Sequence, residues 1–408
     1  MKLPFKSSLA IASAALITTA CDQDVPQAGN APFVICPNSL NMEIIHSQND
    51  FAFTYLSLIP SDDDGNAIVS PLSLSMALSM AANGAEGETL EEIINATGFR
   101  NATLEDVNSQ NSFLLHALPR VDPGTRLSLA NSLWLHEEFP VNEQFQTSSQ
   151  ETYGAEIRRI DMYSTDAMNA INQWAATHTE GMIKNFLSSP PNVMVSIMNA
   201  LYFKGTWAAR FPKSGTEKRT FHNADGTIPK VPMMHDDTHP CTLISDEGIT
   251  AISLPYGNKS FRMTLVLPPS GVTTEECATT LNAERWLNWQ QKFSTSTTAV
   301  ITMPKFDINT GNFPLSMMQT LGMKKAFTPV AEFGIISPKP LFINNIRQHV
   351  HIVVDEHGTE AAAVTDIGLE TALPGAPHPE VTIDRPFIFI ISESTSSSIL
   401  FIGRINNL

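Results

Sequence analysis

Residues 356–379 join two stretches with opposite structural requirements. No proline occurs from residue 356 to residue 373, and alternation along 359–370 puts the charges of Glu360, Asp366 and Glu370 on one face. The other face carries only small or apolar side chains: Thr359, Ala361, Ala363, Thr365, Ile367 and Leu369. This pattern predicts a β-strand that is buried on one side.

The residues that follow cannot continue such a strand. Pro374, Pro377 and Pro379 lie within six residues, and proline cannot donate to a hydrogen-bonded ladder, so this part predicts an exposed extended loop. Residues 361–363 are all alanine, which has weak strand propensity, and they need a neighbouring site ready to accept them. We therefore expect the segment to occupy two places, a loop and a strand within a sheet.

Composition excludes several classes of function. The 408 residues contain 25 Lys plus Arg against 41 Asp plus Glu, a net charge of −16, so nucleic acid is not an expected partner. With 42% hydrophobic residues the chain can bury a large core. The sequence lacks a CxxC pair and the hydrolase, metalloprotease and P-loop motifs, so we expect no cofactor, no metal and no enzymatic activity. His349 and His351 could face one way on a strand, but no third ligand accompanies them.

The first 20 residues predict an export signal. Lys2 and Lys6 precede an uncharged apolar stretch of about a dozen residues, which is too short to span a membrane. Cys21 follows Thr18-Thr19-Ala20, which resembles a bacterial lipobox although Thr18 departs from it. Lipidation of Cys21 is therefore predicted, with ordinary secretion as the alternative. The expected location is extracellular or periplasmic, with membrane contact only through the lipid.

Residues 21–45 are expected to form a tether, because they contain Pro, Gly and Asn without periodicity. Cys36, Cys241 and Cys277 are expected to be unpaired thiols. Residues 46–408 contain no repeat and no linker, which indicates a single domain.

Helical spacing or capping patterns begin at several places in this domain. A helix is expected over 49–59, one after Ser70-Pro71, and one over 165–179. Two further starts are predicted from capping boxes, one at Thr89 with Glu92 and one at Thr103 with Asp106. Strands are expected over 127–135, 193–203, 248–268, 298–306, 347–355, 386–392 and 399–405. Because helices and strands do not alternate regularly, the predicted class is α+β with large mixed or antiparallel sheets.

Four separated motifs resemble one family in the order expected for it. They are Glu356–Ala363 (EHGTEAAA); Ser70–Ser73 with Gly84–Thr89; Asn199–Trp207 (NALYFKGTW); and Asp384–Phe389 with Phe401–Ile405. Over nearly all of residues 46–408 the sequence is similar to the serpins. That resemblance implies a large central sheet, about eight to nine helices and an exposed reactive-centre loop at 356–379.

The resemblance also implies a suicide inhibitor of serine proteases, which needs no catalytic residue of its own. The protease cuts the loop as an acyl-enzyme, and the freed hinge inserts into the main sheet as a new strand. By the resemblance the hinge comprises Glu356, Gly358, Thr359, Glu360, Ala361, Ala362 and Ala363, with Thr359 entering first. The alternative is a non-inhibitory relative that acts as a carrier, a chaperone or a plain protease substrate. A membrane-tethered binding module is a third hypothesis.

The family's spacing places the cut 16 residues after Glu356, between Ala372 and Leu373. The neighbouring Thr371-Ala372 bond is the alternative, and counting back from the following strand moves the cut toward Gly375. These residues suit elastase-like or chymotrypsin-like proteases, while a cysteine protease stays open as a target.

The resemblance assigns further residues to the opening of the sheet. Ser70 and Asn199 match positions beneath the main sheet, and Trp207 matches the place where the hinge enters. Gln348 stands where the family usually has a histidine. Residues 103–118 contain no Lys or Arg, so no heparin-type polyanion is expected, and the chain is expected to be a monomer.

Overall fold

The computed structural model describes residues 33–408 except 294, 312–314, 345, 347 and 360–377. Within these residues it contains nine α-helices and two large sheets, which confirms the predicted α+β class. The helices are α1 (Met42–Leu58), α2 (Pro71–Ala82), α3 (Gly87–Ala96), α4 (Leu104–Ala117), α5 (Glu143–Tyr153), α6 (Thr165–His178), α7 (Thr274–Thr280), α8 (Ala283–Gln290) and α9 (Leu315–Thr320).

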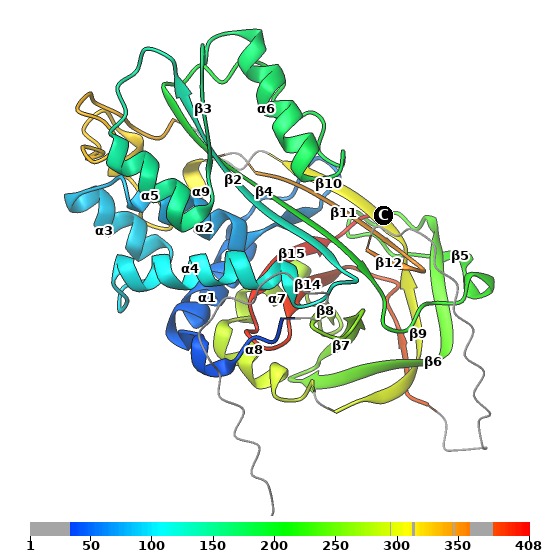
Figure 1. Cartoon of the computed structure of the whole chain (residues 1–408). Coiled ribbons are helices and arrows are strands. Elements are labelled where there is room, and N and C mark those ends of the chain that lie inside the picture. The colour runs from blue at the N-terminus through cyan, green and yellow to red at the C-terminus, as the bar shows by residue number, and fades with distance from the viewer. Residues whose placement is uncertain (1–32, 294, 312–314, 345, 347, 360–377) are drawn as a thin grey trace, which may run out of the picture.

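A six-stranded sheet runs through the upper half of the molecule as seen in Figure 1. Its order is β10 (Phe306–Gly311), β11 (His349–Asp355), β12 (Gly358–Thr359), β4 (Val195–Thr206), β2 (Arg126–His136) and β3 (Glu156–Ile160). The strands β2 and β4 pair along ten residues, from Arg126 opposite Lys204 to Leu135 opposite Val195. This pairing confirms the strands expected over 127–135 and 193–203.

A nine-stranded sheet packs beneath it. Its order is β1 (Ala67–Val69), β15 (Ile399–Ile405), β14 (Phe387–Glu393), β8 (Phe261–Leu267), β7 (Ile249–Tyr256), β6 (Lys230–Asp246), β9 (Thr297–Pro304) and β13 (Glu380–Thr382), with β5 (Glu217–Thr220) on β6. The strands β14 and β15 are buried throughout, as expected of apolar runs at the centre of a sheet.

Helices cover both faces of the six-stranded sheet. On one face α6 packs Ile171 and Trp174 against Trp134 of β2 and Met198 of β4, which confirms a helix lying across the sheet (Figure 1). On the other face α2 lies between the two sheets and is almost fully buried. The core therefore continues through both sheets.

Of the two predicted capping boxes, one formed. Thr103 and Asp106 form the expected capping box of α4. The box predicted at Thr89 and Glu92 is wrong, because α3 begins two residues earlier, at Gly87. The Thr89 hydroxyl instead accepts the Glu332 backbone N–H, and Glu92 accepts two backbone N–H groups at residues 324 and 325.

The expected tether is shorter than 21–45. Ile35 and Leu40 are buried, the Phe33 N–H donates to the carbonyl of Arg120, and Asn41 caps α1. Residues 33–45 therefore belong to the folded body, because the apolar side chains of Ile35 and Leu40 are buried in its core.

The cysteines also differ from expectation. Cys36 is disulfide-bonded, so its predicted free thiol is wrong, whereas Cys241 and Cys277 are free and buried as expected. Cys21 and the signal segment lie outside the described residues. Among the helices that the structure describes, none has the length and apolarity of a membrane span.

Candidate functional site

The hinge begins inside the six-stranded sheet. After β11 the chain turns and returns as β12, which pairs with β11 on one side (Val354 opposite Thr359) and with β4 on the other (Gly205 opposite Thr359). Figure 1 shows β12 at this position beside β11. Glu356, Gly358 and Thr359 are buried, which corrects the expectation of a loop exposed from residue 356 onward. Two residues of the hinge are thus already a strand in the intact chain.

Glycine at position 358 permits this approach. A Cβ atom there would lie 2.0 Å from the Gly205 carbonyl oxygen, and the backbone φ is +150°, a conformation that other residues rarely adopt. Glycine at position 358 therefore lets β12 reach β4.

An ion pair holds the turn. The Lys305 ammonium donates to Glu356 Oε2 at 2.8 Å, and the Thr216 hydroxyl donates to Oε1 at 2.8 Å. Burial on its own would raise the pKa of Glu356, but the bonds from Lys305, the backbone and Thr216 outweigh it and hold the pKa below its usual value. Glu356 is therefore ionised at neutral pH.

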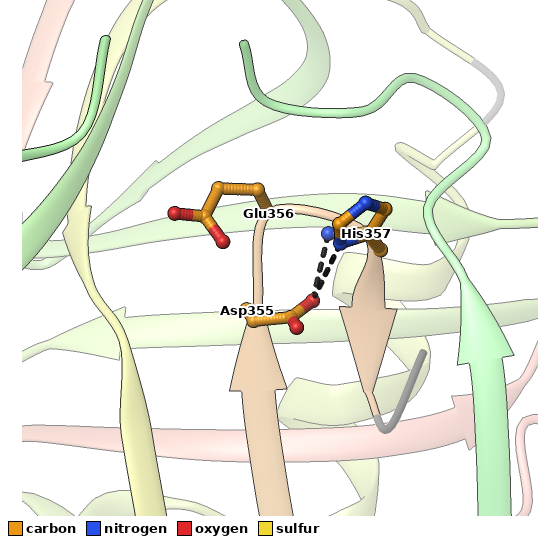
Figure 2. A group of neighbouring side chains, drawn as sticks. All are labelled: Asp355, Glu356 and His357. Atoms are coloured by element: carbon orange, nitrogen blue, oxygen red, sulfur yellow. Dashed lines mark hydrogen bonds and ion pairs between the residues drawn. The ribbon is translucent and has the colours of Figure 1, made fainter. Parts of the chain in front are cut away.

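Three neighbouring side chains of the turn offer ligand atoms within 4.8 Å of one another: Asp355, Glu356 and His357 (Figure 2). Their atoms already have protein partners. Asp355 Oδ1 accepts the backbone N–H groups of His357 and Gly358 and lies 3.5 Å from His357 Nδ1, while Glu356 is paired with Lys305. We assign no ion to this group.

Trp207 contacts the turn before β12. Its indole N–H donates to the Asp355 carbonyl at 2.9 Å, and its backbone N–H donates to the His357 carbonyl at 2.7 Å. Its ring stacks on Tyr256, with centroids 4.4 Å apart. Trp207 thus fixes the turn before β12.

Ser70 and Asn199, two of the predicted sheet-opening residues, bond to different neighbours, and sequence reasoning missed the neighbours of Asn199. Asn199 accepts from the Ser73 hydroxyl and donates to Asn131 Oδ1 at 2.6 Å. Gln348 bonds the backbone N–H and carbonyl of Ser70, at 2.9 and 2.8 Å. The buried Ser70 hydroxyl has no hydrogen-bond partner among the described residues. Ser73 follows Ser70 by three residues, so helical spacing could have indicated a second hydroxyl on the same face of α2.

A cavity of about 320 Å³ lies beside the first residues of β4, whereas β12 pairs with the last residues of β4. One wall is β4 from Val195 to Asn199, and the opposite wall contains Asn344, Ile346 and Gln348, which precede β11. Its floor includes Leu74 and Leu78 of α2. Between its walls, among the described residues, no strand joins β4 to β11 except β12.

Glu360, Ala361, Ala362 and Ala363 of the hinge lie outside the described residues, as do the predicted reactive-bond residues Thr371, Ala372 and Leu373. The chain is described again from His378, whose Nδ1 lies 3.0 Å from the Thr298 hydroxyl on β9. Both ends of the loop are therefore anchored on sheets.

Comparison with known proteins identifies similar chains of almost the same length. A family model described as "Serpin (serine protease inhibitor)" matches residues 46–408. "Iripin-1" of Ixodes ricinus is 30% identical over 383 residues, which cover 92% of this chain and 97% of that protein. The native-state structure of the thermophilic serpin tengpin is 26% identical with a TM-score of 0.82, covering 92% of this chain and 96% of that one. Thyroxine-binding globulin in complex with thyroxine is 25% identical with a TM-score of 0.79, covering 89% and 99%.

Proposed function

This chain belongs to the serpin family, and we propose that it inhibits serine proteases by covalent trapping. In this proposal the protease serine attacks the loop carbonyl, the peptide bond breaks, and the new amine leaves with the C-terminal part of the loop. The freed hinge inserts into the six-stranded sheet before water hydrolyses the acyl-enzyme ester. The chain itself supplies no catalytic group.

One observation carries the proposal. If β12 were extended in its present pairing with β4 and with β11, the uncharged side chains of the loop would fall in the cavity. Continuing the register of β12 on β4 would put residues 365–369 opposite 199–195. Continuing its register on β11 would put the same residues opposite 348–344. These are the two walls of the cavity, so the cavity is where the lower part of an inserted strand would lie.

The face that would enter the cavity is free of charge. Side chains two residues apart share a face, so Thr365, Ile367 and Leu369 would follow Thr359 inward. Glu360, Asp366 and Glu370 would point to the opposite side of the sheet, away from the cavity, so no charge would enter the cavity. A hinge with this pattern supports inhibition rather than a plain substrate role.

We place the cleaved bond at Ala372-Leu373, with Thr371-Ala372 as the alternative. A cut after Leu373 would put Pro374 on the leaving side, and a tertiary amide is a poor substrate for serine proteases. No Lys or Arg occurs between His357 and Asp384, so the proposed targets are elastase-like or chymotrypsin-like enzymes rather than trypsin-like ones. We propose that the inhibitor acts as a monomer without a heparin-type cofactor.

The test is to mix the mature protein with pancreatic elastase or chymotrypsin and to analyse the products on denaturing gels. We expect an adduct that survives denaturation and has the combined mass of protease and cleaved inhibitor. Mass spectrometry of the released C-terminal peptide identifies the bond. Complete loop cleavage with full protease activity would contradict the proposal and favour a non-inhibitory role, such as the carrier role suggested by the similarity to thyroxine-binding globulin.

We also propose that residues 1–20 direct export and that the mature chain begins at Cys21. Lipidation and ordinary secretion predict different fates for that residue. Cys36 requires a disulfide partner, and a Cys21 sulfur that carries a lipid thioether cannot be one. The mass of the N-terminal peptide, measured with and without reduction, distinguishes the two forms.

A further inference from the structure

A hydrogen bond between the two sheets holds Thr359, the hinge residue expected to enter the sheet first. The hydroxyl of Tyr256, on β7 of the nine-stranded sheet, lies 2.6 Å from the hydroxyl of Thr359, on β12 of the six-stranded sheet. Tyr256 is 0% exposed and Thr359 is 1% exposed. Burial raises the pKa of Tyr256, so the phenol is protonated at neutral pH and its hydroxyl can donate to or accept from Thr359.

Packing fixes the position of the Tyr256 hydroxyl. Trp207 stacks on the ring within 10° of parallel, and Phe203 meets it edge-on with centroids 5.1 Å apart. Gly205 leaves room for it, since a Cβ there would lie 3.0 Å from Tyr256 Cδ1. With so little freedom left to the ring, the hydroxyl is preorganised to receive Thr359.

The strand that it holds is short. The strand β12 contains only Gly358 and Thr359, so its backbone bonds to β4 and β11 are few. Among the described residues, the Tyr256 bond is the only side-chain hydrogen bond recorded for Thr359. A buried hydroxyl without a partner is costly, so this one bond has a large effect on whether Thr359 stays in the sheet.

We propose that Tyr256 is a positioning residue for protease trapping, because its hydroxyl seats Thr359 between β4 and β11 before the loop is cut. The inference rests on the proposed function. Insertion of the cleaved loop then extends an existing strand and does not have to start a new one. Starting an ordered segment is the unfavourable step, because several residues are fixed before many bonds form.

The position of Thr359 affects how much protease is trapped, because insertion of the loop competes with hydrolysis of the acyl-enzyme. A seated hinge inserts sooner, and more protease is trapped for each loop cut. An unseated hinge gives water more time, and more inhibitor is consumed as a substrate. The number of inhibitor molecules needed to inactivate one protease measures this competition directly.

The test uses Tyr256→Phe, which removes the hydroxyl and keeps the stacked ring, and Thr359→Val, which replaces the hydroxyl by a methyl group. Thr359→Ser keeps the hydroxyl and serves as the conservative variant. The matched control is Tyr153→Phe, since Tyr153 is 1% exposed and donates a bond of the same length, 2.6 Å, to Asn108. Tyr153 lies on α5, away from the hinge.

The first measurement needs no protease. Hydrogen exchange followed by mass spectrometry reports how often the hinge peptide leaves the sheet in the intact protein. We expect about five- to tenfold faster exchange of the peptide spanning 357–360 in Tyr256→Phe and Thr359→Val, the effect of one lost hydrogen bond. Thr359→Ser and Tyr153→Phe should exchange there like the wild type.

The second measurement is the stoichiometry of inhibition of pancreatic elastase. It should rise about twofold or more in Tyr256→Phe and Thr359→Val, and the double variant should add little, because both changes remove one interaction. Tyr153→Phe should lower thermal stability without changing the stoichiometry. If the wild type forms no adduct, the proposed function fails, while hydrogen exchange still decides whether Tyr256 seats the hinge. Unchanged exchange at 357–360, or an unchanged stoichiometry in Tyr256→Phe with an active wild type, would overturn the inference.

Discussion

At the scale of single residues, the turn before β12 depends on a carboxylate that the protein keeps ionised. Glu356 receives Lys305 and Thr216, and its pKa lies below the usual value. A carboxyl with a lower pKa in the folded state stabilises the fold above its unfolded-state pKa. That contribution is lost as the pH falls through the folded-state pKa.

Replacing this carboxylate should therefore have a pH-dependent effect. We expect Glu356→Gln to lower the free energy of unfolding by about 1–3 kcal/mol at pH 7, because Lys305 loses its buried partner. The difference from the wild type should shrink as the pH falls below the usual carboxyl range, near 4. Urea denaturation at a series of pH values measures it, with the exposed Glu138→Gln as control. A difference that does not vary with pH would contradict the assignment.

Residue-level predictions from the sequence succeeded where a residue's partner is near in the chain. The capping box at Thr103 involves residues three apart, and it formed as predicted. The box at Thr89 failed because Glu332, more than 240 residues away, supplies the competing contact. The bond from Tyr256 to Thr359 joins residues 103 apart and has no local signal, so the sequence could not reveal it.

At the scale of elements, the alternation along 359–370 is the property that should decide whether the loop can insert. The strands predicted from long apolar runs all formed, including β4, β14 and β15. The longest strand, β6, was missed because Pro232, Pro240 and several polar residues interrupt it, and its register shifts between Asp236 and His239. The hinge was predicted to enter the sheet only after cleavage. The strand β12 has only two residues, which is too short for alternation in the sequence to predict it.

Two neighbouring alanines offer a matched test of the alternation. Ala363→Arg would put a charge on the inward face and should convert the inhibitor into a substrate, since burying an unpaired charge costs several kcal/mol. Ala362→Arg would put the same charge on the outward face and should keep trapping. Adduct yields on denaturing gels compare the two. Equal adduct yields from these variants would show that the face does not matter.

At the scale of the whole molecule, the account requires that the intact fold is not the most stable arrangement of the chain. The cavity between β4 and the residues before β11 leaves a site in the sheet that the loop could fill. Filling it would add hydrogen bonds on two sides of a new strand and bury an apolar face. The overall fold and the hinge could be predicted from motifs, but the partly seated hinge and the cavity depend on contacts between distant segments.

The most direct measurement is a comparison of thermal unfolding for the intact protein and for the same protein cut once in its loop. A new strand of about 12 residues, with about 1 kcal/mol for each hydrogen bond, stabilises the cut form by on the order of 10 kcal/mol. The unfolding midpoint should therefore rise by about 10–15 °C after cleavage. Superimposable unfolding curves for the two forms would contradict the account, because no energy would then be available to trap a protease.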